Sequence, residues 1–379
     1  MAKYVNGDTV GTARRRQSSV LAKEDIDYLP VIFGNWDRIE PKDTERLEEV
    51  PHYDWKEQWH EPAKSLTEQL RNQLGLVLAG GDSVPSVRAD TGVINCMTIF
   101  GADYVVPEHT KPVVSEYVPK EDLQQFEVPD DISRMGIMPR MVEHMEHHLA
   151  VLKEHGLDGL VSVYHCDQQG PFDIAAQARG HDVFTDMYED PPFVHDLMAK
   201  CTDVYIKVSK LCKKVNGEPL DGGNAVSVWM KNGGVRMCGD SDILMSADQY
   251  REFVQKYQEE AFAAFSGGWL HYCGGWIDTG RSEGIHLHEA YSEVEGLRGL
   301  NWTTGKDWVA EMRKLKELGI VHIGGLRQED DEPLEDYLRR VLSPYDKRAG
   351  IIFQAMGIQG DAEEIITTWR RLQDEKFGE

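Results

Sequence analysis

Two residues with metal-ligating side chains, His271 and Cys273, stand one residue apart in the stretch GGWLHYCGGW, residues 267–276. The apolar run before them is typical of a buried strand, and side chains two apart on a strand point to the same side. An imidazole and a thiolate on one side can bind one ion, and zinc accepts both. The pattern therefore predicts half of a metal site at a strand end, with a structural pair in a tight turn as the alternative.

Two further clusters of polar residues follow apolar runs in the same way. Asp167 lies in VYHCDQQGPFD, and Asp240 lies in VRMCGDSDILMS. Both carboxylates are candidates to position a substrate. The alternatives are a helix-capping turn for Asp167 and ordinary turn chemistry for Asp240.

Other conspicuous ionisable residues are expected to lie in solvent. His144 and His148 are four apart in MVEHMEHHLAVLKEHG, but this run alternates with glutamates and lacks HExxH order. We therefore expect a solvated helix face there. His286 and His288, in GIHLHEAY, would be well placed for a site if their loop covers the barrel mouth, but a lone loop histidine is usually exposed. Arginines 14–16 are expected to be the solvated start of a helix.

The segments around these residues alternate between strand and helix patterns. Buried strands are predicted at residues 30–33, 159–164, 225–229, 269–272, 296–302, 320–323 and 350–353. Helices are predicted at residues 63–78, 139–154, 191–214, 247–264, 307–318, 333–342 and 361–373. About eight such units favour an α/β fold, a (β/α)8 TIM barrel, whose functional residues lie at the carboxyl ends of the strands. No strand-linked GxGxxG fingerprint is present, so no nucleotide cofactor is expected.

A single domain with an N-terminal extension is expected. The stretch EPKDTERLEEVPHYDWKEQWHEP, residues 40–62, is charged, aromatic and bounded by prolines. We therefore expect residues 1–62 to form an extension that packs on a barrel of residues 63–379.

The composition limits the class of partner. Asp and Glu outnumber Lys and Arg by 65 to 41, and the net charge of −24 disfavours nucleic acid and anionic membranes. No apolar run reaches membrane-spanning length, and the start lacks the apolar core of a signal peptide, so a cytoplasmic protein is expected. The six cysteines form no CxxC pair and are expected to be free thiols. A small-molecule substrate fits these limits.

Four stretches, taken in order, resemble the uroporphyrinogen decarboxylase superfamily. They are GPFDIAAQARG (170–180), DSDILMSADQYREFVQKY (240–257), LHYCG (270–274) and GLRGLNW (296–302). The likeness runs from about residue 31 to the last helix. It implies a (β/α)8 barrel with its active site in the cleft at the carboxyl ends of the strands.

His271 and Cys273 look like the His-X-Cys motif of one branch of this superfamily. That branch consists of zinc-dependent methyltransferases, which move a methyl group between a corrinoid carrier and a thiol such as coenzyme M. The resemblance therefore implies zinc, a corrinoid carried by a partner protein, and methyl transfer. Met356, in FQAMGIQG, stands where the branch has a further cysteine, and a neutral thioether is a poor zinc ligand. The candidates to complete the site are Cys238, His165, Gln354 and a carboxylate.

The same likeness leaves two alternatives. Uroporphyrinogen decarboxylases use no metal and hold an octacarboxylate with arginines, but the family's arginine-rich segment is replaced here by GNWDRIEP. A decarboxylase of a tetrapyrrole or a smaller carboxylic acid would use Asp82, which sits roughly where the family's substrate-binding Asp falls, and Arg88. The other alternative is a non-catalytic protein that binds a small molecule or a corrinoid. The sequence also allows a homodimer.

Overall fold

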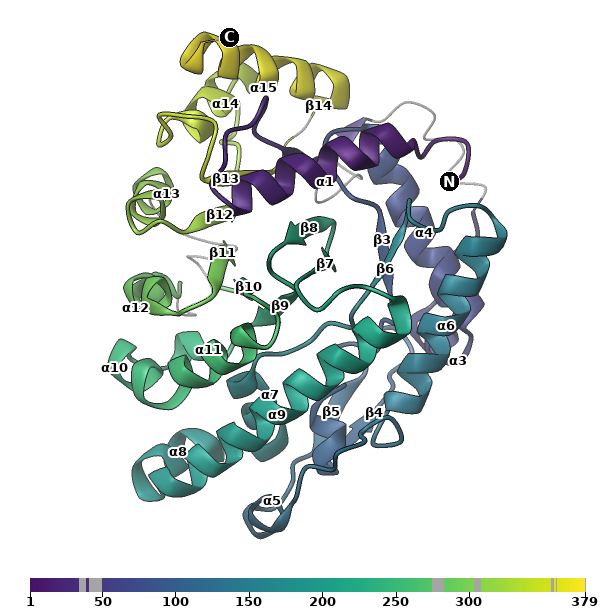
Figure 1. Cartoon of the computed structure of the whole chain (residues 1–379), viewed down its shortest axis with the longest axis vertical. Helices are drawn as coiled ribbons and strands as arrows, with labels where there is room; N and C mark the ends of the chain where they lie inside the picture. The colour runs from purple at the N-terminus through teal and green to yellow at the C-terminus, as the bar shows by residue number, and fades with distance from the viewer. Residues whose placement is uncertain are drawn as a thin grey trace.

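A parallel sheet of six strands forms most of the barrel wall in the computed structural model, which describes residues 1–33, 39–40, 50–274, 283–302, 308–355, 358 and 360–378. The strand order is β1 (Val31–Phe33), β13 (Ile351–Ala355), β12 (Val321–Gly324), β11 (Leu297–Trp302), β10 (Gly268–Tyr272) and β9 (Val235–Cys238). A parallel pair, β3 (Ser86–Arg88) and β6 (Ser162–Tyr164), lies on the opposite side of the barrel (Figure 1). Met356 lies outside the described residues.

Backbone hydrogen bonds join this pair to both edges of the six-stranded sheet. Asp82, before β3, donates its N–H to the carbonyl of Val31 in β1 at 2.7 Å. Gly170, after β6, donates to the carbonyl of Cys238 in β9 at 2.8 Å, beside a parallel bridge between Gln169 and Cys238. The strands thus form the (β/α)8 barrel that the alternation predicted.

Helices surround the strands as an outer ring (Figure 1). The longer helices of this ring are α4 (Pro62–Ala79), α6 (Met138–Glu154), α9 (Pro191–Asn216), α13 (Trp308–Glu317) and α15 (Ala362–Phe377). The shorter helices are α3 (Trp55–His60), α5 (Lys120–Gln125), α7 (Pro171–Arg179), α8 (Asp182–Glu189), α12 (His288–Glu293) and α14 (Leu334–Leu342). The predicted helix 247–264 is α10 (Ala247–Tyr250), a π-helical turn and α11 (Lys256–Ala263). Proline begins α4, α7 and α9, where its missing N–H costs no hydrogen bond.

Among the described residues, three small two-stranded sheets lie outside the barrel wall. They are β2 (Ile39–Glu40) with β14 (Gly360–Asp361), β4 (Asp103–Val105) with β5 (Val113–Glu116), and β7 (Gly222–Ala225) with β8 (Val228–Lys231). The last pair corrects the parallel strand predicted at 225–229, because the chain reverses direction within that run. Val226 and Ser227 have φ of 50° and 62°, the left-handed conformation of a two-residue hairpin turn.

The helix α1 (Gly7–Leu21) and the β7–β8 hairpin pack together at the amino-terminal end of the barrel. Gln17 of α1 donates to the carbonyls of Asp82 and Ser227, at 2.6 and 3.1 Å. Arg16, expected in solvent, is buried instead and pairs with Asp82 at 2.7 Å and Asp27 at 2.6 Å. The reason is that α1 turns its Arg16–Gln17 side towards the barrel, where Asp82 supplies a buried negative charge.

The first barrel strand belongs to the segment expected to be an extension. β1 pairs with β13 in parallel, with Val31 opposite Phe353 and Phe33 opposite Ala355. The sheet therefore begins before residue 63, and the stretch 1–62 contributes a strand to the barrel as well as the covering helix α1.

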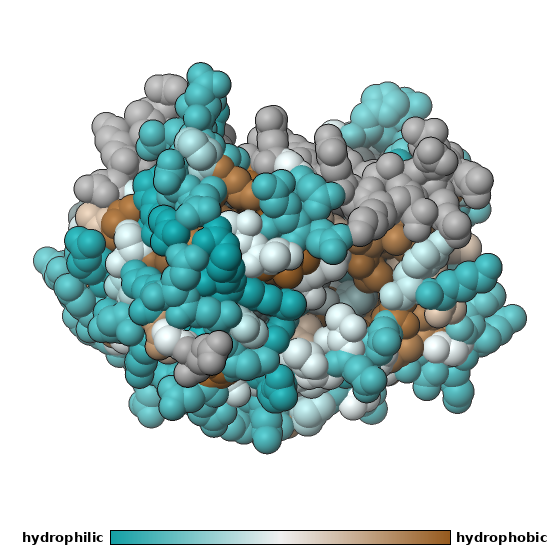
Figure 2. All heavy atoms as spheres, turned by 90° about the horizontal axis from the view of Figure 1, so that it is seen from above, coloured by the Kyte–Doolittle hydropathy of each residue, from teal (hydrophilic) through white to brown (hydrophobic). Residues whose placement is uncertain are grey.

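Hydrophilic residues dominate the face of the molecule seen in Figure 2, and hydrophobic residues form smaller separate patches there. The six cysteines are free, as predicted, and all except Cys273 are buried. Among the residues described, no helix combines the length and the apolar character that crossing a membrane requires.

The histidines of α6 are buried, contrary to the expectation of a solvated face. His144 is 2% exposed and His148 is fully buried, next to the backbone of Trp59 and Pro62. The glutamates 143 and 146 point to solvent instead. The histidines, at i and i+4, share the inward face of the helix with two methionines, 141 and 145. The glutamates fall on the opposite face because of the 3.6-residue helical repeat.

The free energy of unfolding is expected to decrease as the pH falls from about 6.5 to about 4. An unfolded histidine takes up its proton near pH 6.5, whereas burial lowers the pKa of His144 to about 4 and that of His148 to about 3. The folded chain binds fewer protons in this window, so stability present above pH 6.5 is lost on acidification. Thermal unfolding at about pH 7.5 and about pH 5 tests this. The fall in stability from about pH 7.5 to about pH 5 should be smaller for His148→Leu than for the unmodified protein. An equal fall in both proteins would show that His148 does not contribute to the pH dependence.

Candidate metal centre

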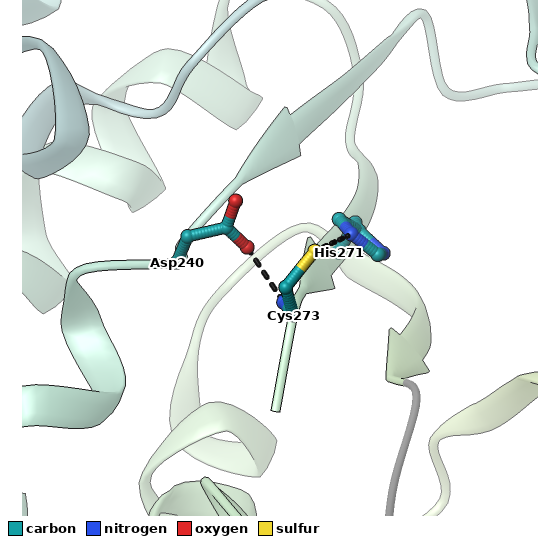
Figure 3. Close-up of side chains that lie close together, drawn as sticks. All are labelled: Asp240, His271 and Cys273. Atoms are coloured by element: carbon teal, nitrogen blue, oxygen red, sulfur yellow. Dashed lines mark hydrogen bonds between the residues drawn. The ribbon is translucent and has the colours of Figure 1, made fainter. Parts of the chain in front are cut away.

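His271 and Cys273 lie at the carboxyl end of β10, with their side chains in contact. The Nε2 atom of His271 is 3.1 Å from Sγ of Cys273. Asp240, which follows β9, accepts a hydrogen bond from the backbone N–H of Cys273 at 2.6 Å. The ligand atoms of Asp240, His271 and Cys273 all lie within 4.8 Å of one another (Figure 3). Neighbouring parallel strands thus bring an imidazole, a thiol and a carboxylate to one point of the barrel rim.

Asn301 of β11 fixes the orientation of His271. The two residues are opposite each other in the β10–β11 register, and the side-chain amide of Asn301 donates to the carbonyl of Ile323 and to Gln354. A carbonyl only accepts, so the amide oxygen of Asn301 must face Nδ1 of His271, which therefore carries the hydrogen. This leaves the lone pair of Nε2 directed towards Cys273, as a metal ligand requires.

The protonation states of the pair follow from their surroundings. Burial, followed by the charge of Arg236, lowers the pKa of His271 to about 4. Burial and the neighbouring Asp240 raise the pKa of Cys273 to about 12. At neutral pH His271 is thus ready to bind a metal, while Cys273 is a thiol that must lose a proton to become a ligand.

A charged network lies beside the triad. Asp167 bridges two guanidinium groups, with Arg236 at 2.7 Å and Arg88 at 3.2 Å. Arg88 also pairs with Asp90 at 3.2 Å, and Lys111 pairs with the same carboxylate at 3.1 Å. Burial alone would raise the pKa of Asp167, but the two arginines hold it well below its usual range. The network is therefore fully ionised at neutral pH and presents fixed charges next to the metal ligands.

The other candidate ligands are not among the three grouped ligand atoms. Gln354 accepts a hydrogen bond from the amide of Asn301 at 3.2 Å. Cys238 is opposite His271 in the β9–β10 register, but its sulfur is not among the ligand atoms grouped within 4.8 Å. His165 is buried against the carbonyl of Cys166. Asp82 precedes β3 and bonds the N–H of Val31 at the start of β1, so it lies at the amino-terminal end of the barrel, away from the triad.

Sequence reasoning missed two residues that shape the site. Asn301 and Arg236 are polar residues within strands, in GLNW and VRMC. Asn301 is opposite His271 on the neighbouring strand, and Arg236 is two residues before Cys238, which is also opposite His271. The available signal was a polar residue inside an apolar run. Such a residue, spaced by two from a candidate ligand, lies on the same side of its strand as that ligand.

Comparison with known proteins settles the family. A family model described as Uroporphyrinogen decarboxylase (URO-D) matches residues 12–355. The chain belongs to this URO-D family. The solved structures similar to this URO-D protein include a methyltransferase from Methanosarcina mazei, with a TM-score of 0.63 and 14% identity over 95% of this chain and 98% of the other. No curated protein matches.

The donor set of this URO-D family member fits a zinc-like divalent ion. Imidazole nitrogen, thiolate sulfur and carboxylate oxygen are all zinc ligands, and three protein ligands leave a position for a substrate. The lone pair of His271 Nε2 directed towards Cys273 supports the fit, because the tautomer is held by Asn301 and not by the metal itself.

Replacing Asn301 by leucine is expected to lower the affinity for zinc about 10- to 100-fold. The leucine side chain is of similar size but cannot hold the Nδ1 hydrogen of His271, so the ring would be free to rotate or to change tautomer. Competition with a chromophoric chelator measures the affinity. An unchanged affinity in a folded Asn301→Leu protein would show that the tautomer is fixed by something else.

Proposed function

We propose that this URO-D family member is a zinc-dependent methyltransferase that moves a methyl group between a corrinoid carrier and a thiol or similar acceptor. His271, Cys273 and Asp240 would hold the zinc. The observation that carries the proposal is the convergence of these three donors at the carboxyl end of the barrel, with the free lone pair of His271 facing Cys273. The fold shared with a protein described as a methyltransferase supports it.

A zinc ion bound there would lower the pKa of an acceptor thiol and keep it as the thiolate. The chain itself would do the rest of the work. Asn301 keeps Nε2 of His271 unprotonated, and Asp240 and Cys273 supply the charge that a divalent cation needs. The charged network of Arg88, Asp167 and Arg236 would orient the polar part of the acceptor.

A decarboxylase is the weaker candidate. It would need Asp82 close to the substrate, and this carboxylate instead pairs with Arg16 and the start of β1 at the far end of the barrel. Arg88, the other residue of that hypothesis, pairs with Asp90 and Asp167 in the charged network, which either activity could use, so it does not separate the two. With a single thiolate, the proposed site would also suit activation of water or a carbonyl, which a substrate panel would reveal.

An anaerobic assay with methylcobalamin as the surrogate donor and a panel of thiols tests the proposal. In the reaction the sulfur bonds to the methyl carbon, the electron pair of the cobalt–carbon bond stays on cobalt, and the thiol proton goes to solvent. We expect thiol-dependent loss of the methylcobalamin spectrum and formation of a methyl thioether with the zinc-loaded protein. Cys273→Ala should abolish both signals. No turnover with any thiol by zinc-loaded protein, together with carbon dioxide release from a carboxylic acid, would replace methyl transfer by decarboxylation.

Zinc binding is expected to release about one proton per ion at neutral pH. His271 is already neutral there, whereas Cys273, with a pKa of about 12, must ionise. The affinity should consequently rise about tenfold per pH unit in the neutral range. Calorimetry in buffers of different ionisation enthalpy measures the proton count. Release of no proton would mean that Cys273 is not a ligand, and release of two would bring a second thiol into the site.

A further inference from the structure

We propose that Asp173 is the positioning residue that holds Asp240 in place as the third metal ligand. Asp173 lies in the first turn of α7, and the residue is 2% exposed. Its Oδ2 atom accepts the backbone N–H of Asp240 at 2.9 Å, and its Oδ1 atom accepts that of Ser241 at 2.6 Å. Both carboxylate oxygens therefore hold successive peptide groups of the turn after β9.

This contact fixes the turn from which Asp240 reaches the neighbouring strand. Gly239 donates its N–H to the carbonyl of His271 at 2.8 Å, and the side chain of Asp240 accepts the N–H of Cys273. A continuous chain of hydrogen bonds thus runs from Asp173 through Asp240 to Cys273. Because the turn is held at two peptide groups, the Asp240 carboxylate has few positions to occupy, which is the preorganisation that a metal site needs.

Two backbone donors explain why a carboxylate is used at position 173. A carboxylate offers an acceptor oxygen to each N–H, whereas an asparagine side chain offers a single acceptor oxygen and places an NH₂ group against the second N–H. The two N–H donors therefore account for an acid at position 173, and asparagine is the substitution that removes one of the two hydrogen bonds.

The inference rests on the metal site of the proposed function, and a double-mutant cycle tests it. Zinc affinity would be measured for the unmodified protein, Asp173→Asn, Asp240→Ala and the double variant. We expect Asp173→Asn to lower the affinity about 10- to 100-fold. In the Asp240→Ala background the same change should have no further effect, because Asp173 acts through Asp240. An equal loss in both backgrounds would overturn the proposal.

Cobalt(II) spectra and a matched variant separate positioning from a general loss of stability. The visible bands of cobalt-loaded Asp173→Asn should shift towards those of Asp240→Ala, which a purely structural role would not cause. Asp242→Asn is the matched control, since Asp242 is also buried near this turn but bonds Gln258 at 2.7 Å instead of the Asp240 backbone. It should keep both affinity and spectrum, and a loss as large as that of Asp173→Asn would contradict the proposal.

The experiment distinguishes failure of this inference from failure of the proposed function. If the unmodified protein binds no zinc or cobalt, the metal site itself is wrong and the inference falls with it. If the unmodified protein binds metal and Asp173→Asn binds it equally well, only the role of Asp173 is wrong. Should Asp173→Asn fold poorly, Asp173→Ser keeps one acceptor in a smaller side chain and carries the same expectation.

Discussion

Replacing Cys273 by alanine is expected to lower the affinity for zinc by at least about a hundredfold, more than the loss of a residue that only supports a ligand. The change removes the sulfur donor that lies 3.1 Å from His271 Nε2 and leaves a nitrogen and an oxygen donor. Because Cys273 is exposed, its truncation creates no buried cavity and the fold should remain intact. Equilibrium dialysis followed by elemental analysis measures the zinc bound per chain.

Cys238→Ala is the matched control for this experiment. Cys238 is the cysteine opposite His271 on the neighbouring strand, and the sequence made it a candidate ligand. Its sulfur is outside the group of three ligand atoms, so its removal should leave the zinc affinity nearly unchanged. If Cys238→Ala loses zinc while Cys273→Ala keeps it, the site has been assigned to the wrong cysteine.

Replacing Asp82 by alanine is expected to lower the free energy of unfolding by about 3 kcal/mol without changing the zinc affinity. The variant removes the buried partner of Arg16 and the acceptor for the N–H of Val31. Asp27 remains paired with Arg16, so the lower end of the range for breaking a buried ion pair applies. Chemical denaturation of the zinc-free proteins gives the difference in stability.

Asp27→Ala is the control variant, because Asp27 is the solvent-exposed partner of the same arginine, Arg16. The Asp27 side chain is 43% exposed, so its ion pair is screened by solvent and its loss should cost less than about 1 kcal/mol. An Asp82→Ala protein that is as stable as the unmodified one but inactive would contradict the structural role. That result would return Asp82 to the catalytic site and revive the decarboxylase hypothesis.

Strands, and the side of the strand that a residue faces, could be predicted well from the alternation of residues in the sequence. The apolar run before His271 marked β10, and the spacing of two placed His271 and Cys273 on one side of it, as the structure shows. The barrel followed from repeated strand and helix patterns, because each unit carries its own local periodicity. The third donor of the triad could not be chosen in this way. Register alone would favour Cys238, which is opposite His271, but the turn after β9 brings the Asp240 carboxylate to the pair instead. The contacts that hold this turn, from Asp173 and from the carbonyl of His271, are tertiary and leave no local pattern in the sequence.

Burial of charged and titratable residues was the part that sequence patterns predicted wrongly. Arg16, His144 and His288 were all expected at the surface, and each is buried in the structure. His288 contacts the hydroxyl of Tyr272 at 2.7 Å and Glu311 at 3.1 Å, two groups that only the folded barrel brings together. A local pattern states which face a residue occupies, but not what covers that face.

X-ray absorption at the zinc edge of the metal-loaded protein tests the central claim most directly, because it counts the atoms bound to the ion. A site made by His271, Cys273 and Asp240 predicts one sulfur at about 2.3 Å, with imidazole nitrogen and oxygen at about 2.0–2.2 Å. The sulfur should disappear from the spectrum of any zinc that Cys273→Ala retains. Two or more sulfurs, or a shell without sulfur in the unmodified protein, would contradict the site proposed from this structure.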